Sequence, residues 1–346
     1  MTKNDSVPIG LDEFVKLTNI AHWIYRIWTI AFILIGLTGN FIALIIFIRW
    51  ANQLSVYIYF SFLCIINIVI LLIDMNYHFL LSFILDDNIL VKTLLPVTCK
   101  FIFFLTYLFR YLFIWTIVMI NIDRFIYLNE HSFKKKFCQR RTAKMMCFVL
   151  ILLSFLANWH FLIYFNQPII TEVPLDNTCF LDGLTCHCTS LNTAYRSFWK
   201  NIWPIYNLMI FGIIPLVTMI TCCILIIRNI YLTRRRIFDG RQNSDVSVNS
   251  KNHNLRSIIK TLIWLDLLFP ITIFPSLSLQ IYINYQSPKQ CEKIGIMNLV
   301  FSLVFAMMYI KNTFAFFIFY FAGQQFRRAL SKLIHCRNTF DYTESR

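Results

Sequence analysis

Seven long apolar stretches alternate along the chain with shorter polar segments. They cover residues 27–48, 55–73, 101–122, 145–171, 201–227, 261–284 and 294–322. Each stretch is long enough to cross about 30 Å of hydrocarbon as a helix. The strands of an outer-membrane barrel would be shorter and would alternate apolar with polar residues. The pattern therefore predicts an all-α membrane protein, a bundle of seven transmembrane helices.

A shorter amphipathic stretch follows the seventh apolar segment. In residues 323–335, Phe and Leu side chains recur beside Arg and Lys. This pattern is typical of a helix that lies on the membrane surface. We therefore divide the chain into an N-terminal segment (1–23), the bundle (24–322), and an amphipathic eighth helix with its tail (323–346).

The composition excludes most classes of soluble protein. Of the 346 residues, 58% are hydrophobic and only 14% are charged, against about 25% charged in soluble domains. The 32 Lys and Arg outnumber the 17 Asp and Glu, which gives a net charge of +15. A nucleic-acid binder would explain that charge but not the apolar excess.

The distribution of charge along the chain predicts the orientation in the membrane. The N-terminus and the loops after the second, fourth and sixth helices carry nine basic and nine acidic residues. The other loops and the C-terminus carry 21 basic and six acidic residues. Cytoplasmic loops are enriched in Lys and Arg. We therefore expect a multi-pass protein of the plasma membrane with its N-terminus outside and its C-terminus in the cytoplasm.

Two modification sites follow from this orientation. Asn4-Asp5-Ser6 is a glycosylation sequon on the outer side. Cys336 follows the amphipathic stretch on the inner side, so it is either a palmitoylation site or a free thiol. Five cysteines fall outside, where oxidising conditions allow a disulfide. The first 20 residues contain three acids and no long apolar core, so we expect no signal peptide.

The spacing of two residues in the third helix carries a resemblance to a known family. Cys99 at the outer end is followed 25 residues later by Arg124, within Ile122-Asp123-Arg124-Phe125. This resembles the third helix of rhodopsin-like G-protein-coupled receptors, where a Cys and an Asp-Arg-Tyr triplet have the same separation. Phe125 replaces the Tyr.

Other helices match the family in part. The matches are Gly39-Asn40 in the first helix, Asn67 at the Asp position of the second, Pro215 in the fifth, and Phe269 with Pro275 in the sixth. The seventh helix departs from the pattern, because Asn312 is followed by Thr and the family's Asn-Pro is missing. The chain therefore resembles a divergent member of the family.

The resemblance implies roles for several residues. Arg124 would pair with Asp123 at rest and meet a heterotrimeric G protein on activation, with Phe125 completing this switch. Cys99 would form a disulfide with Cys188 or Cys186, of which we prefer Cys188. No Gly-rich phosphate loop and no spaced set of metal ligands is found on the cytoplasmic side. We therefore expect no enzyme activity, no cofactor, no metal and no nucleic acid.

Two charges at similar depth in the membrane invite two interpretations. Arg110 lies 11 residues after Cys99, which is about 16 Å along a helix, and Asp74 should reach the same depth. Arg110 either anchors a ligand carboxylate or forms a structural pair with Asp74. Charges inside the membrane mark functional sites by default, so we place both residues in the ligand site.

Thr106 occupies the position where amine receptors carry an aspartate, so an amine ligand would lack its counter-ion there. Tyr107, Asn207 and Gln280 are further candidates for the ligand cavity, although core packing explains them equally well. The family's sodium site is also altered. Its Asp is Asn67, its Ser is Phe113, and Lys311 lies nearby. Like-charge repulsion then disfavours sodium.

These observations predict a receptor that binds an extracellular ligand in the bundle and activates a heterotrimeric G protein. The absent amine counter-ion, the buried Arg110 and the long segment 166–200 favour a neuropeptide as the ligand. A small acidic molecule or an odorant is the alternative within the family. A transporter or channel is the alternative from another class, with Asp74, Arg110, Asp266 and Lys311 lining a polar pathway.

Overall fold

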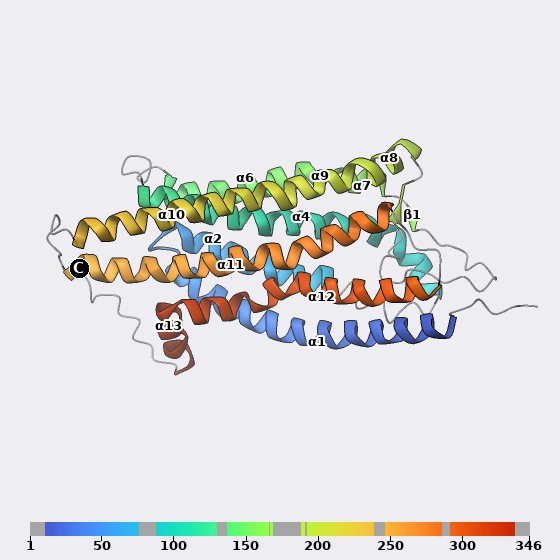
Figure 1. The fold of residues 1–346 in the computed structure, drawn as a ribbon, viewed down its shortest axis with the longest axis horizontal. Coiled ribbons are helices and arrows are strands. Elements are labelled where there is room, and N and C mark those ends of the chain that lie inside the picture. The colour runs from blue at the N-terminus through green and yellow to red at the C-terminus, as the bar shows by residue number, and fades with distance from the viewer. Residues whose placement is uncertain are drawn as a thin grey trace, which may run out of the picture.

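The fold is described from a computed structural model. It describes residues 11–75, 88–129, 137–165, 167–168, 188–190, 192–238, 246–285 and 291–335. The long helices run side by side along one axis (Figure 1). In chain order, the elements are α1 (Leu11–Trp50), α2 (Ser55–Ile70), the π-helical η1 (Leu71–Met75), α4 (Asn88–Asn129), α6 (Arg140–Asn158), α7 (His160–Tyr164), β1 (Gln167–Pro168), β2 (Cys188–Thr189), α8 (Thr193–Ser197), the π-helical η3 (Phe198–Ile202), α9 (Trp203–Asn207), the π-helical η4 (Leu208–Ile213), α10 (Ile214–Phe238), α11 (Val246–Tyr285), α12 (Cys291–Ala322) and α13 (Gln324–Ile334).

The predicted fold class is confirmed. The described residues contain seven helical spans that are long and apolar enough to cross a membrane. The amphipathic eighth helix is α13, which lies across the bundle at one end (Figure 1). Two strands of two residues each, β1 and β2, pair in antiparallel fashion and contact α4 at the other end of the bundle.

Several helices extend beyond the apolar stretches that predicted them. The first begins at Leu11, although its apolar stretch begins at residue 27, and the third spans Asn88–Asn129. Apolar stretches mark the part of a helix that lies in hydrocarbon, whereas hydrogen bonding continues the helix into polar surroundings. The fourth predicted stretch instead divides at Trp159 into α6 and α7.

The fifth span changes its helical winding along its length. It runs through α8, η3, α9 and η4 into α10. The π-helical turn η4 ends at Ile213, two residues before Pro215, the second residue of α10. Proline has no N–H to donate into the preceding turn, and π turns arise where regular helical hydrogen bonding is interrupted. Pro215 therefore accounts for the position of this irregular turn.

The first and last spans approach each other closely over two glycines. A Cβ atom at Gly39 would lie 2.8 Å from the Cβ of Phe316 in α12, and one at Gly36 would lie 3.3 Å from the Cα of Thr313. Glycine removes the side chain that would keep the two backbones apart. This approach brings α1 and α12 within reach of backbone-to-side-chain hydrogen bonds.

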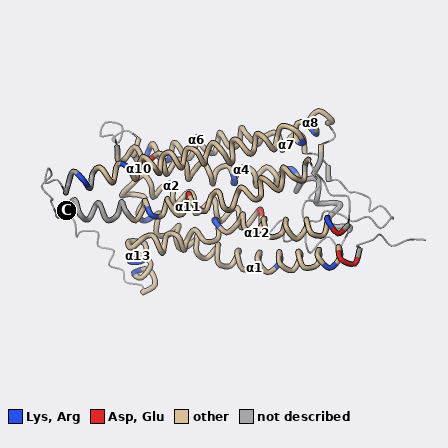
Figure 2. Tube along the Cα trace, viewed as in Figure 1, with Lys and Arg blue, Asp and Glu red and all other residues tan. Residues whose placement is uncertain are grey.

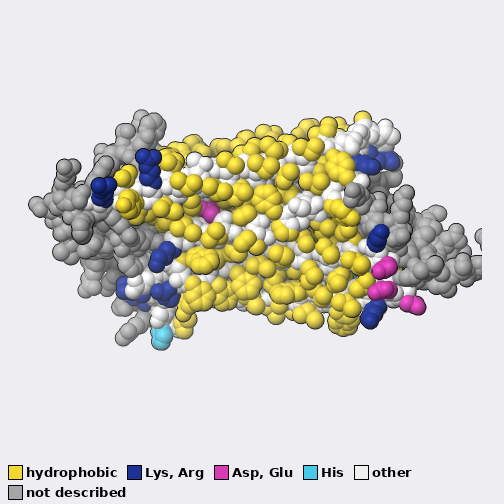
Figure 3. All heavy atoms as spheres, viewed as in Figure 1, with side chains coloured by type: hydrophobic (Ala, Val, Ile, Leu, Met, Phe, Trp, Pro, Cys, Tyr) yellow, Lys and Arg dark blue, Asp and Glu magenta, His cyan; other side chains and the backbone are white. Residues whose placement is uncertain are grey.

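The surface of the bundle has an apolar belt between two polar ends (Figure 3). We name the end that carries α13 the basic end, because Lys and Arg predominate there in Figure 2. Acidic residues appear at the opposite end, where α1 and α12 begin with Asp12, Glu13 and Glu292. The seven apolar spans and the apolar belt on the surface both indicate a multi-pass membrane protein.

Candidate functional site

Three asparagines join the first, second and last spans inside the bundle. Asn67 Nδ2 donates to Asn40 Oδ1 over 2.9 Å, and Asn312 Nδ2 donates to Asn67 Oδ1 over 2.9 Å. Asn40 Nδ2 closes the network on the Asn312 carbonyl at 2.9 Å. All three side chains are buried, and satisfied polar networks of this kind fix one arrangement of the surrounding helices.

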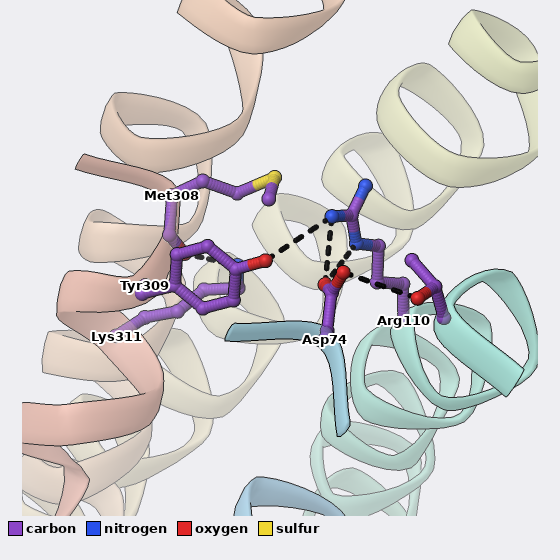
Figure 4. Close-up of polar contacts among 6 residues, drawn as sticks. Asp74, Arg110, Met308, Tyr309 and Lys311 are labelled. Atoms are coloured by element: carbon purple, nitrogen blue, oxygen red, sulfur yellow. Dashed lines mark hydrogen bonds and ion pairs between the residues drawn. The ribbon is translucent and has the colours of Figure 1, made fainter. Parts of the chain in front are cut away.

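A buried ion pair lies further along the second span, between η1 and α4 (Figure 4). Arg110 donates to Asp74 Oδ2 from Nε over 3.0 Å and from Nη2 over 2.7 Å. Thr106 Oγ1 donates to the other carboxylate oxygen over 3.1 Å. Nη2 also lies 3.3 Å from the Tyr309 hydroxyl of α12. This pair therefore links three spans of the bundle.

Lys311 reaches inward from α12 beside this pair (Figure 4). Its Nζ donates to the Met308 carbonyl over 2.8 Å and lies 5.2 Å from the centroid of the Phe113 ring. Only 6% of Lys311 is exposed. Lys311 and Arg110 line one small cavity together with Ile70, Phe113, Phe211, Met308, Tyr309 and Asn312. Because these groups come from four spans, the cavity lies inside the bundle.

A second ion pair lies at the basic end, within α4. Arg124 Nε donates to Asp123 Oδ2 over 3.0 Å, and Arg124 Nη2 contacts the same oxygen. Ser55, the first residue of α2, donates to Asp123 Oδ1 over 2.8 Å. The guanidinium carbon of Arg124 lies 4.7 Å from the centroid of the Tyr127 ring. Both charged side chains are fully buried.

Comparison with known proteins decides the family. A family model described as the 7 transmembrane receptor (rhodopsin family) matches residues 39–315, well over half of the chain. The chain belongs to this family. The resemblance read from Cys99, Arg124 and their neighbours is thereby confirmed. Among curated proteins, no match was found. Members of the rhodopsin family are generally receptors rather than enzymes, and they signal through G proteins.

In this receptor, the predicted ligand residues fall into separate groups. Asp74, Thr106 and Arg110 are joined by hydrogen bonds. Tyr107 is buried in an aromatic cluster, with ring centroids 4.9 Å from Phe161 and 5.6 Å from Trp203.

Two other predicted ligand residues contact neighbouring tyrosines. The Gln280 side chain lies beside the Tyr107 hydroxyl. Asn207 accepts a hydrogen bond from Tyr111 over 3.1 Å. Of the six residues predicted for the ligand site, Arg110 alone lines the small cavity.

The structure also decides how Arg110 is held. The predicted pair with Asp74 is present, and 18% of the Arg110 side chain remains exposed. Its Nη1 makes no hydrogen bond to any residue that the structure describes. Guanidinium groups carry five N–H donors. Arg110 therefore has donors left for a ligand while its charge is balanced by Asp74.

Asp266 forms a polar cluster that the sequence did not predict. Asp266 of α11 accepts from Asn121 Nδ2 over 2.9 Å and from Cys223 Sγ over 3.0 Å. These bonds join α4, α10 and α11. Asp266 could be recognised from sequence as an intramembrane charge, but no motif spacing links it to Asn121 or Cys223. Long-range pairs of this kind become visible only when the helices are placed together.

The residues at the family's sodium site do not fit a sodium ion. Asn67 stands at the position of the expected carboxylate, and both polar groups of its side chain are used by Asn40 and Asn312. The Phe113 ring faces the ammonium of Lys311. Among the described residues, no cluster of three His, Cys, Asp or Glu has the arrangement of a metal site.

The remaining predicted sites rest on side chains outside the described residues. These are the Asn4 glycosylation site, the Cys336 palmitoylation site and the Cys99–Cys188 disulfide. The residues of the predicted switch are described. Asp123 and Arg124 form the predicted pair, and Phe125 beside them is half-buried.

Proposed function

We propose that this protein is a plasma-membrane receptor that binds an extracellular peptide and activates a heterotrimeric G protein at its basic end. The N-terminus would lie outside and α13 would lie at the cytoplasmic surface. The buried Asp123–Arg124 pair is the observation that carries the proposal. It stands in a member of the rhodopsin family, at the end where Lys and Arg predominate (Figure 2).

The pair has the features of a switch held in a closed state. Asp123 and Arg124 are adjacent on one helix, so the pair can open without separating two helices. Arg124 Nη1 is buried and has no hydrogen-bond partner in the described part of the chain. A buried guanidinium donor without a partner is costly. An acceptor supplied by a G protein would satisfy it once the basic end opens.

The polar residues inside the bundle support a peptide as the ligand. Thr106 replaces the amine counter-ion, and the nearby Asp74 is already bound by Arg110 and Thr106. An amine would have to compete with a guanidinium for this carboxylate. The free donors of Arg110 instead favour a group that accepts hydrogen bonds, such as a peptide carbonyl or carboxylate. A small acidic molecule satisfies the same chemistry and is the alternative ligand.

The test is a peptide-library screen in cells that express the receptor with a promiscuous G protein. We expect at least one peptide to stimulate nucleotide exchange. Arg124→Ala should abolish exchange without loss of surface expression. The matched control is Arg140→Ala, an exposed arginine at the basic end that bonds Asn52. If no peptide stimulates nucleotide exchange but small carboxylates do, the ligand is a small acidic molecule and not a peptide. Substrate uptake without any nucleotide exchange would show that the protein is a transporter and not a receptor.

A further inference from the structure

The cavity beside the Asp74–Arg110 pair is lined by two cations. Arg110 and Lys311 both face it, and the other lining residues are uncharged: Ile70, Phe113, Phe211, Met308, Tyr309 and Asn312. Asp74 binds Arg110 directly, through both Nε and Nη2. The aspartate therefore balances one of the two positive charges, and the charge of Lys311 is left over.

In its protonated form, Lys311 has unused donors. It carries three N–H groups, and its one hydrogen bond to a described residue is the bond to the Met308 carbonyl. Within the described part of the chain, no Asp or Glu forms an ion pair with it. The Phe113 ring supplies a weaker attraction through its face. Buried charges in proteins are paired or they bind an ion.

The size of the cavity limits what can supply the missing charge. The volume of the cavity is about 10 Å³. This is enough space for about one water molecule. A peptide carboxylate or a phosphate is too large for this space. A monatomic anion fits, and it would gain from both cations in surroundings where charges interact strongly.

We propose that this cavity binds a single monovalent anion of halide size, with chloride as the physiological ion, held by Lys311 and Arg110. The Asn312 amide, which also lines the cavity, donates one hydrogen to Asn67 and has a second available for the ion. The anion balances the charge on α12 and fastens α12 to α4. This site shares Arg110 with the proposed peptide site and is separate from the G-protein switch. Its tests use neither a peptide nor a G protein, so they can fail while the proposed function holds, and the reverse.

The test uses the purified full-length receptor in lipid nanodiscs at constant sodium concentration. Chloride is replaced stepwise by gluconate, which is too large for the cavity, and thermal unfolding is followed. We expect the melting temperature to rise by a few degrees, in proportion to the logarithm of the chloride concentration once that concentration exceeds the dissociation constant, as ligand linkage requires. Bromide should act like chloride. An unfolding temperature independent of the anion would show that water alone fills the cavity, and would overturn the proposal.

Lysine variants separate a specific site from a general salt effect. Lys311→Met and Lys311→Gln both remove the charge, and each should raise the chloride concentration needed for a given rise in melting temperature by at least about tenfold. Lys293→Met is the matched control, because Lys293 is exposed on the same helix; it should keep the wild-type response. A chloride response that survives in both Lys311 variants contradicts the site.

A measurement on the wild-type receptor covers the case in which the variants do not fold. The ³⁵Cl resonance of free chloride broadens when the ion exchanges with a protein site. We expect broadening by the receptor that bromide reverses and gluconate does not. If the receptor does not broaden the chloride resonance, or if bromide does not reverse the broadening, the proposal is wrong.

Discussion

The two buried acid–arginine pairs of this receptor have the same local geometry, but one lies within a single helix and the other joins two helical elements. In each, one carboxylate oxygen accepts from both Nε and Nη2 of the arginine. Asp123 and Arg124 are adjacent residues of α4 at the basic end. Asp74 and Arg110 stand 36 positions apart and join η1 to α4. The same bond is therefore a local contact in one place and a link between helices in the other.

The surroundings of the pairs reinforce this difference. Asp74 and Arg110 are tied to further helices, since Arg110 also contacts Tyr309 of α12 and the cation-lined cavity. Among the described residues, the side chains of the Asp123–Arg124 pair form hydrogen bonds to another helix only through Ser55, at the start of α2. A pair that spans helices resists their separation, whereas a pair within one helix can open while the helices stay packed. We therefore expect the first pair to serve stability and the second to serve the proposed switching.

The largest expected effect is on stability and comes from Asp74→Ala. The change leaves Arg110 buried with no counter-charge, and removing one partner of a buried pair costs about 3–5 kcal/mol. Thermal unfolding of the purified receptor should show a large fall in melting temperature, with reduced surface expression. The double variant Asp74→Leu with Arg110→Met should recover much of the loss, since apolar residues of similar size replace both charges. No recovery would mean that the pair does more than balance charge.

Asp123→Ala should give a smaller loss of stability with a gain of activity. Arg124 lies five residues before the end of α4, so without Asp123 its long side chain can turn toward the polar surface of the basic end, and we expect a cost of about 1–3 kcal/mol. Freed from its neighbour, Arg124 should raise nucleotide exchange in the absence of ligand. Exchange assays on membranes with matched receptor levels measure this. A stability loss as large as that of Asp74→Ala, with no gain in exchange, would remove the contrast between the pairs.

Ser55→Ala tests the residue that ties the Asp123–Arg124 pair to a second helix. The Ser55 hydroxyl donates to Asp123 Oδ1 over 2.8 Å, and its loss should cost about 1 kcal/mol. We expect a slight rise in ligand-independent exchange, below that of Asp123→Ala. Ser61→Ala is the matched control, because Ser61 donates to the Tyr57 carbonyl within α2. Equal effects of both changes would show that Ser55 matters only for the helix.

Charge and spacing account for what the sequence could predict. The seven spans followed from apolar length, and the Asp74–Arg110 pair followed from depth counted along two helices. The Asp123–Arg124 pair followed from a motif. The Asp266 contacts with Asn121 and Cys223 could not be predicted, because helix rotation decides which side chains meet and no spacing rule fixes it. The irregular fifth span escaped for a related reason, since hydrophobicity does not report a change of winding.

The smallest expected effect is that of sodium on agonist affinity, which we expect to be close to zero. Lys311 places a positive charge beside the site where other family members hold sodium, and Asn67 supplies no carboxylate there. We expect agonist affinity to change less than about twofold when sodium gluconate replaces potassium gluconate, which keeps the anion constant. A strong, saturable loss of agonist affinity with sodium would require a cation to bind beside the ammonium. Lys311 would then have to be neutral, and the case for a bound anion would fall with it. The sodium and chloride titrations therefore test the same charge with ions of opposite sign.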